Sequence, residues 1–499
     1  MKAVISYARL PEKELLYFKQ ELDKRLIHVS AVVTHSGELK HGRKILPQAS
    51  FYVIDDYNNA HAWDAKSDYF DYTRPLKYKA DWTSPLDLDL YNQIVLPNLQ
   101  MYLPIVERFV PYEGGSMEAE TRLLFDFSKA HEIIRELKPD ILLFYLEPQT
   151  GLENMLYVLG KHFNIPCIVV RVGIFRHSCG VSLSYDAPLL DEAWNPHPDT
   201  LVVGNEIDAV SGMHPRTKQL IEKIQDTKQK YKAGYMYGLN LIKSPKELIK
   251  HSWKSKVDWK RWWMFGVNPP FGNWFKYKLY QKYRSAMQPI PSHNDGLVLY
   301  FPLHYQPELN TMPRGKEFVN QLKVLKLLSD HLPPGGIILV KEHHGVFSRT
   351  HFTNQNFRPS TYYNWMRRMP NVYLVSDDIH TVELQNRCDY VVTVTGNAGL
   401  EAMVRGKKVL HFGIASYSNG PGVYRIKHGF DLERVFAMNK NEETILPDVI
   451  PFIQAIDKVC YHTDANMNSA SFDDQRLIHW INTLMAGFDV FMNKNKQTA

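Results

Sequence analysis

Polar residues able to bind an anion follow two apolar runs in the second half of the chain. The run LVLYFPL leads into HYQPE, where His304, Gln306 and Glu308 bring three hydrogen-bonding side chains close together. The run GIILV leads into KEHH, and strand alternation puts Lys341 and His343 on one face. Lys and His side chains can meet a phosphate group without a metal ion. An ordinary polar turn is the alternative interpretation of each segment.

A third segment, TVTGNAGLEA, joins the end of a strand to the start of a helix. Thr395, Gly396 and Asn397 lie at this junction, where the first N–H groups of the helix can bind an anion. Glu401 falls on the first helical turn, and Thr395 or Asn397 can cap the helix. A fourth segment of small residues follows the next apolar run and carries Tyr417. The alternative for both segments is a capped helix or a loop that binds nothing.

The first half of the chain offers two carboxylates in LEPQTGLEN. Glu147 follows an apolar run, and Glu153 begins the next helix. A carboxylate opposite a leaving phosphate could accept a proton from an attacking hydroxyl or bond to the reacting carbon. Glu153 is alternatively a residue that interacts with the helix dipole, which makes Glu147 the stronger candidate. The one Asp-x-Asp, at 87–89, lies in an irregular segment far from these turns, so no metal site is predicted.

These residues must be positioned by strands. The first half carries apolar runs that we interpret as strands at 3–8, 28–34, 50–55, 140–146 and 166–172. The second half alternates helices with strands at 297–303, 336–343, 372–376, 389–395 and 408–413. This pattern predicts an α/β protein of two doubly wound, Rossmann-like domains facing a cleft. Ligands bind at the carboxyl ends of parallel strands, so the four C-terminal segments are expected to converge.

A basic, aromatic stretch interrupts the alternation. Between Lys218 and Arg284 there are 16 Lys and Arg residues against four Asp and Glu, and five of the ten tryptophans: Trp253, Trp259, Trp262, Trp263 and Trp274. This composition favours contact with an anionic membrane surface, and a helical pair packed on the domains is the alternative. No nucleic-acid recognition module is visible. We predict domains at 1–213 and 291–435, a helical elaboration and linker at 214–290, and C-terminal helices at 436–499 that pack back on the domains.

Composition places the chain among ordinary globular proteins. Of its 499 residues, 44% are hydrophobic and 22% are charged, and the net charge is +6. Its four cysteines lie far apart, which suggests neither a disulfide framework nor a zinc site. The N-terminus lacks the features of a secretory signal, and no apolar run reaches about 18 residues. A cytoplasmic protein, peripheral at most on the inner membrane, is expected.

The motifs HYQPE, TMPRG, VKEHHG and TVTGNAGLEAMVRGKKVLHFG resemble the capsule polysaccharide biosynthesis family. That family is similar to bacterial Kdo transferases and, more distantly, to bacterial sialyltransferases of the GT-B fold. The resemblance covers about 297–425 and is thinner at 139–166. It implies a metal-independent enzyme with an N-terminal acceptor lobe and a C-terminal lobe for the nucleotide-sugar. Lys341 and His343 match an element that contacts the donor phosphate, although relatives usually have His-Pro where this chain has His343-His344.

The resemblance therefore implies a glycosyltransferase without a cofactor, acting on a capsule or surface polysaccharide acceptor that is free or lipid-linked. By analogy alone, the donor is a CMP-activated acidic sugar such as Kdo or a nonulosonic acid, and a UDP-sugar fits nearly as well. Glu147, Glu153 and His304 are the candidate catalytic residues. A CDP-glycerol-type polyol-phosphate transferase and a non-catalytic capsule assembly or export protein are the alternatives. The sequence leaves the acceptor, the anomeric outcome and the oligomeric state open.

Overall fold

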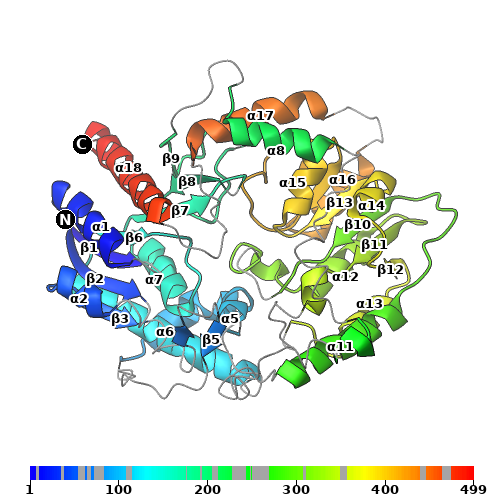
Figure 1. Ribbon diagram of the computed structural model, residues 1–499, viewed down its shortest axis with the longest axis horizontal. Coiled ribbons are helices and arrows are strands. Elements are labelled where there is room, and N and C mark those ends of the chain that lie inside the picture. The colour runs from blue at the N-terminus through cyan, green and yellow to red at the C-terminus, as the bar shows by residue number, and fades with distance from the viewer. Residues whose placement is uncertain are drawn as a thin grey trace. The chain divides into compact units, whose positions relative to one another are not determined.

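The computed structural model of the chain contains two compact α/β units (Figure 1). It describes residues 1–6, 11–34, 39–53, 62–64, 69–71, 84–107, 115–175, 177–191, 194–204, 212–226, 243–247, 249, 269–306, 311–348, 357–438, 445–462 and 474–498. The first unit takes Met1–Val110, Gly114–Thr217 and Ile453–Ala499, and the second takes Pro111–Glu113 and Lys218–Phe452. The predicted pair of Rossmann-like domains is confirmed, and the last part of the chain belongs to the first unit.

The first unit is built on one sheet with the strand order β16-β8-β7-β6-β1-β2-β3, and β9 pairs with β8. The strands from β7 to β3 run parallel, β8 pairs antiparallel with β7, and β16 pairs antiparallel with β8. Their bounds are β1 Lys2–Ser6, β2 His28–Thr34, β3 Ser50–Val53, β6 Ile141–Phe144, β7 Cys167–Val172, β8 Ser178–Ser182, β9 Thr200–Leu201 and β16 Tyr461–His462. A separate hairpin pairs β4 Ala62–Asp64 with β5 Tyr69–Asp71.

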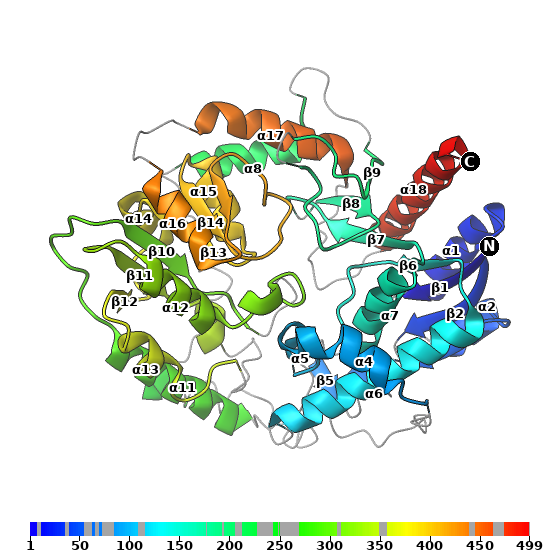
Figure 2. The same ribbon diagram turned by 180° about the vertical axis from the view of Figure 1, so that it is seen from behind.

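Helices from both ends of the chain pack on this sheet. The C-terminal helix α18, Asp474–Thr498, contacts β7, β8 and α1, as can be followed in Figures 1 and 2. Leu477, Trp480 and Leu484 of α18 join Ile5 and Leu143 of the sheet in one buried cluster. The other helices are α1 Glu12–Lys24, α2 Leu39–Ile45, α4 Leu88–Ile94, η2 Leu96–Asn98, α5 Leu99–Glu107, α6 Gly115–Leu137 and α7 Gly151–His162. The apolar face of α18 is therefore part of the first unit's core.

The second unit is built on six parallel strands in the order β12-β11-β10-β13-β14-β15. The bounds are β10 Val298–Pro302, β11 Ile337–Lys341, β12 Val372–Leu374, β13 Tyr390–Thr393, β14 Lys408–His411 and β15 Val423–Arg425. Strands β11 and β12 follow on one side of β10, and β13, β14 and β15 follow on its other side, so the switch point lies between β10 and β13. In an open α/β sheet, such a switch point opens a crevice at the carboxyl ends of the strands, where ligands bind.

Alternation along the strands divides the second unit's side chains between two faces of the sheet. Leu299 and Phe301 of β10 belong to a buried cluster with residues of α11, α12, α13 and α16, whereas Tyr300 between them does not. Helices α14 and α15 contact β10, β13 and β14. The bounds are α11 Pro269–Ala286, η3 Lys316–Phe318, α12 Gln321–His331, η4 His344–Phe347, α13 Tyr362–Arg367, α14 Thr381–Arg387, α15 Asn397–Val404 and α16 Gly429–Ala437. Two further helices, α8 Pro215–Gln225 and α17 Leu446–Val459, have residues in both units.

The strand at 336–343 is shorter than predicted. It ends at Lys341 because the chain enters the 3-10 turn η4, with His343 as its N-cap. Alternation therefore does not extend to His343 and His344, and the predicted shared face of Lys341 and His343 is wrong. The strand at 423–425 was also missed, since its residues lie in the segment that we interpreted as a loop.

We expect Trp480→Ala to lower the free energy of unfolding of the first unit by about 3–5 kcal/mol. The indole is 2% exposed and lies 5.5 Å from the ring of Tyr145, measured between centroids, so truncation leaves a cavity in the core. Urea unfolding followed by circular dichroism measures the loss. Asn493→Ala, at an exposed position of the same helix, is the control. Equal midpoints for the two variants would show that α18 does not complete this core.

Candidate functional site

The switch point of the second unit brings together the ends of β10 and β13. His304 follows β10, and its Nε2 lies 3.0 Å from the backbone N of Val394 and 3.4 Å from that of Thr395. The same nitrogen lies 3.2 Å from the hydroxyl of Thr393. Since a backbone N–H only donates, Nε2 must accept, and the neutral ring carries its proton on Nδ1. His304 is thus suited to donate a hydrogen bond through Nδ1, because its other nitrogen is already used.

The turn between β13 and α15 packs tightly against His304. Gly396 is the N-cap of α15 and donates its N–H to the Thr393 hydroxyl at 2.9 Å. A Cβ at Gly396 would lie 2.6 Å from Cε1 of His304, so only glycine fits. No side chain caps α15, contrary to the expectation for Thr395 or Asn397, and the Tyr417 hydroxyl donates to the Gly396 carbonyl. The uncapped first turn of α15 keeps its N–H groups available for an anion.

Glu401 lies farther along α15 and interacts within its own helix. Its carboxylate is 3.7 Å from Arg405 Nη1, one turn away. Burial raises the pKa of Glu401, and the Arg405 charge opposes that shift. Glu401 therefore lies after the first turn of α15, contrary to the prediction, and forms an ion pair with Arg405.

A buried hydrogen-bond network supports the loops that follow β10 and β11. Arg358 donates to Glu342 Oε2 at 2.8 Å, to the His304 carbonyl at 2.7 Å and to Gln306 Oε1 at 3.1 Å. Gln321 Nε2 donates to Gln306 Oε1 at 2.7 Å, and the Tyr363 hydroxyl donates to Glu342 Oε2 at 2.8 Å. Gln306, predicted to bind substrate, is 2% exposed and is held inside this network. Glu308, the remaining residue of that motif, lies outside the described residues.

Lys341 and the two histidines after β11 face different neighbours. The Lys341 ammonium donates to the Ile379 carbonyl, and burial lowers its pKa. His344 Nδ1 is 4.0 Å from Asp377, and burial with the nearby Lys341 charge lowers the His344 pKa to about 4. The Nδ1 of His343 instead accepts the Gly345 N–H at 3.0 Å. Lys341 therefore shares its surroundings with His344, while all three residues stay at the carboxyl end of β11.

The two candidate carboxylates of the first unit lie near the switch point between β1 and β6. Glu153 forms a capping box with Thr150 at the start of α7 and also accepts a hydrogen bond from Ser6 at the end of β1. These partners occupy both of its oxygens, which favours the structural interpretation of Glu153. Glu147 lies 3.4 Å from Arg171 Nε as a buried ion pair. Glu147 is the carboxylate of the two that does not cap a helix.

The Asp-x-Asp at 87–89 serves as a helix cap. Asp87 is the N-cap of α4, and its carboxylate accepts the backbone N–H of Leu90 at 3.0 Å. Both aspartates are exposed. Of the basic aromatic stretch, Trp274 is described and is 47% exposed, with the Lys278 ammonium 4.6 Å from its ring centroid. Trp253, Trp259, Trp262 and Trp263 lie outside the described residues.

Sequence reasoning missed two polar residues beside the switch point of the second unit. The Arg314 carbonyl accepts the Ile414 N–H at 3.0 Å, and the Arg314 charge opposes the burial that raises the Tyr417 pKa. His411 ends β14 with its ring centroid 5.3 Å from that of Tyr417, and burial lowers its pKa to about 3. The motif TMPRG contained the signal for Arg314. His411 is the first residue of the fourth candidate segment, but its place at the end of an apolar run did not indicate a polar role.

In the first unit, Asp126 is a buried carboxylate that the sequence did not single out. Neither of its oxygens has a hydrogen-bond partner among the described residues, and burial raises its pKa well above the usual range. A Cβ at Gly151, the first residue of α7, would collide with it. Asp126 lies within the long amphipathic helix α6, where nothing in the local sequence distinguishes it from an exposed acidic residue.

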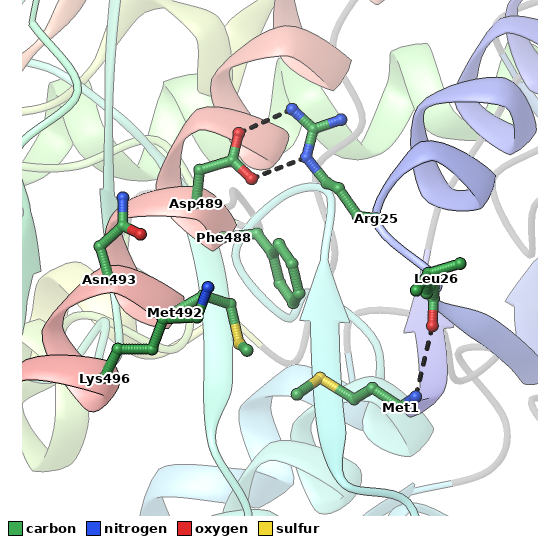
Figure 3. Close-up of a pocket in the computed structure, with 8 residues that line it drawn as sticks. All are labelled: Met1, Arg25, Leu26, Phe488, Asp489, Met492, Asn493 and Lys496. Atoms are coloured by element: carbon green, nitrogen blue, oxygen red, sulfur yellow. Dashed lines mark hydrogen bonds and ion pairs between the residues drawn. The ribbon is translucent and has the colours of Figure 1, made fainter. Parts of the chain in front are cut away.

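A hollow elsewhere in the first unit contains none of the predicted site residues (Figure 3). Arg25 crosses it and pairs with Asp489 through two hydrogen bonds of 2.8 and 2.7 Å. The residues that line it come from the N-terminus, the turn after α1 and helix α18: Met1, Arg25, Leu26, Phe488, Asp489, Met492, Asn493 and Lys496. This ion pair with two hydrogen bonds connects α18 to the end of α1, so we interpret the hollow as structural.

Comparison with known families agrees with the motifs. The family model described as "Capsule polysaccharide biosynthesis protein" matches residues 315–434, which lie within the second unit. The resemblance predicted from the motifs is thereby confirmed over this segment. No curated protein matches the chain in sequence.

Solved structures similar to the chain include two Kdo transferases of Thermosulfurimonas dismutans that are described as KpsC. The beta Kdo 2,4 transferase is 15% identical with a TM-score of 0.28, and the match covers 72% of this chain and 94% of that one. The beta Kdo 2,7 transferase is 11% identical with a TM-score of 0.27, covering 73% and 95%. Anabaena Alr3699/HepE, in complex with UDP and glucose, is 10% identical with a TM-score of 0.27, covering 99% and 100%. At these values, none of them assigns an activity to this chain.

We expect Arg358→Met to destabilise the second unit by about 3–5 kcal/mol, because Glu342 would remain buried without its cation. Both side chains are 0% exposed. Chemical denaturation measures the loss, and Arg367→Met, at an exposed position of α13, is the control. The double variant Arg358→Met/Glu342→Leu should recover part of the loss, since the buried charge is then removed as well. Wild-type stability of Arg358→Met would refute the role of this pair.

Proposed function

We propose that this chain is a glycosyltransferase of capsule polysaccharide biosynthesis, which transfers a sugar from a nucleotide donor to a glycan acceptor. The observation that carries the proposal is the switch point of the second unit, whose strand β13 and helix α15 lie inside the segment that matches the capsule family model. There, His304 and the uncapped start of α15 present N–H donors at the carboxyl ends of neighbouring strands. Such donors suit the phosphate of a nucleotide.

In this proposal, the departing nucleotide phosphate is stabilised by N–H groups and cationic side chains. The α15 amides and His304 Nδ1 form one part of the donor site, and the end of β11 adds the Lys341 ammonium and, on the other side of its loop, the His343 ring. The His343 ring uses Nδ1 to accept a hydrogen bond, so its neutral tautomer carries the proton on Nε2 and can donate it. No step requires a metal ion at the phosphate. Donors aimed at a developing charge stabilise the transition state more than the ground state.

We propose that Glu147 of the first unit acts on the acceptor hydroxyl as the general base. It is preferred over Glu153, whose oxygens already bond to Ser6 and the Thr150 cap. Arg171 beside Glu147 would orient the carboxylate. A CMP-activated acidic sugar such as Kdo is the donor that we place first, and a UDP-sugar second.

The basic stretch between Lys218 and Arg284 is the part that we propose to contact anionic lipid near a lipid-linked acceptor. Its described end, α11, displays exposed Trp274 next to Lys278. Aromatic rings and ammonium groups together favour the interface of an anionic membrane. No described helix is long and apolar enough to cross a bilayer.

Calorimetry with CMP, UDP and CDP tests the donor class. We expect CMP to bind more tightly than UDP, and turnover with the matching sugar donor to survive EDTA. Preference for CDP together with glycerol phosphate transfer would favour a polyol-phosphate transferase. The absence of binding by any nucleotide would favour a non-catalytic capsule protein. A loss of turnover on chelation that Mg²⁺ or Mn²⁺ reverses would refute metal-independent transfer.

We expect His343→Ala to lower kcat by about 10²–10³-fold, the usual cost of removing one donor to a developing anion. Nucleotide affinity should fall only modestly, because the interaction strengthens in the transition state. The control is His344→Ala in the same loop, whose ring faces Asp377 and should matter much less. Steady-state kinetics and nucleotide calorimetry on both variants measure the difference. If His344→Ala were the inactive variant, the donor phosphate would lie on the Lys341–Asp377 side of the loop.

A further inference from the structure

Three histidines from distant parts of the sequence meet in the first unit. His177 directly precedes β8, His214 directly precedes α8, and His462 ends β16. The antiparallel register of β16 on β8 pairs His462 with Ser178, which brings His462 next to His177. One nitrogen from each of the three rings lies within 4.8 Å of the other two. All three residues belong to the first unit, and none is among the residues proposed for sugar transfer.

We propose that His177, His214 and His462 bind a divalent transition-metal ion, with Zn²⁺ as the preferred ion. The ring centroids lie 4.6, 5.2 and 5.7 Å apart in pairs. Imidazoles bound to one tetrahedral zinc have centroids roughly 5 Å apart, because each Zn–N bond is about 2.0–2.1 Å long. The bound nitrogens themselves would lie about 3.4 Å apart, so the rings need to close inward by only about 1 Å.

The hydrogen bonds of His462 leave a nitrogen ready for an ion. Its Nε2 lies 3.2 Å from the main-chain carbonyl of Asp457, and a carbonyl only accepts, so Nε2 carries the proton. The lone pair is then on Nδ1, which is buried and has no hydrogen-bond partner among the described residues. Metal-binding histidines commonly donate their other N–H to a carbonyl or carboxylate in this way.

Asp457 connects the segments that carry the three histidines. Its carboxylate accepts the backbone N–H of His214 at 3.0 Å and the Thr217 hydroxyl at 3.3 Å. Since that hydroxyl donates to Asp457, its oxygen accepts the N–H of His177 Nε2 at 3.1 Å, and His177 keeps a lone pair on Nδ1. The carboxylate also lies 3.7 Å from His462 Nε2. Asp457 therefore orients the rings as an outer partner and supplies negative charge beside a bound cation.

His214 is half-buried, whereas His177 and His462 are buried. The backbone N–H of Arg216 donates to its Nδ1 at 3.3 Å, and this hydrogen bond would be given up when the ring binds the ion. Three protein ligands leave a fourth position for water, as in catalytic zinc sites, whereas structural zinc sites are closed by four protein ligands. The ion would join the start of β8, the start of α8 and β16 of the C-terminal segment. We therefore assign it the role of connecting these segments, separate from transfer at the donor phosphate.

Metal titration of the full chain tests this site without any sugar donor. The protein is stripped with a strong chelator, desalted and titrated with Zn²⁺ by calorimetry and with Co²⁺ by visible absorption. We expect one equivalent of either ion per chain, and Co²⁺ bands of tetrahedral intensity. Zn²⁺ should raise the Tm of the stripped protein, because an ion that binds only the folded state stabilises it. An absence of Co²⁺ bands and of a Zn²⁺-dependent Tm would overturn the proposal.

Variants locate the ion. His462→Ala and His214→Ala should lose Zn²⁺ binding, and Asp457→Asn should weaken it by about 10–100-fold, as expected for an outer partner. His162→Ala, exposed at the end of α7, is the matched control and should bind like wild type. If His462→Ala fails to fold, half-buried His214→Ala decides, with far-UV circular dichroism to verify its fold. Wild-type Zn²⁺ affinity in His214→Ala would overturn the site, whatever the outcome for nucleotide binding.

Discussion

The buried ion pair between Arg358 and Glu342 is the constraint on which the second unit's candidate site depends. Removing two charges from water costs several kcal/mol per ion, and good geometry must offset that cost. The guanidinium achieves this by donating to Glu342, to Gln306 and to the His304 carbonyl. These acceptors lie on the loops after β10 and β11, so one planar cation fixes the ends of two neighbouring strands. Lysine could not replace it, because a single ammonium cannot reach acceptors in such a fork.

From this pair, a chain of contacts extends to the start of α15. The fixed His304 main chain places the ring so that Nε2 accepts the N–H groups after β13. Thr393 then receives the Gly396 N–H, and Tyr417 closes the turn from the far side. The anion-binding end of α15 is therefore assembled by neighbours rather than by its own cap. This explains why no capping side chain is needed at Gly396.

The sequence predicted the elements better than the contacts. Apolar runs bounded by polar turns predicted all but one strand of the second sheet, because strands buried on both faces carry a strong local signal. They also indicated that His304 and Thr395 follow strands of one sheet, and in the structure the His304 ring lies 3.4 Å from the Thr395 backbone N. Local patterns could not predict the buried partners of Gln306 and Glu153, since these depend on tertiary contacts. Arg358, which is distant in sequence, donates a hydrogen bond to the Gln306 side chain, and Ser6 of β1 donates one to the Glu153 carboxylate.

The packing partner of the last helix could not be predicted from local sequence patterns either. Helix α18 is amphipathic, and its apolar face indicates that it packs on something without indicating which sheet. The structure places Leu477, Trp480 and Leu484 in the same buried cluster as residues of β1 and β6. The first unit therefore cannot bury its core until the C-terminal segment has been synthesised, which makes its folding depend on very long-range contacts. His462 on β16 lies in that late segment, so an ion held with His177 and His214 would connect it to strands formed much earlier. A metal cross-link has most to contribute where the loop it closes is longest.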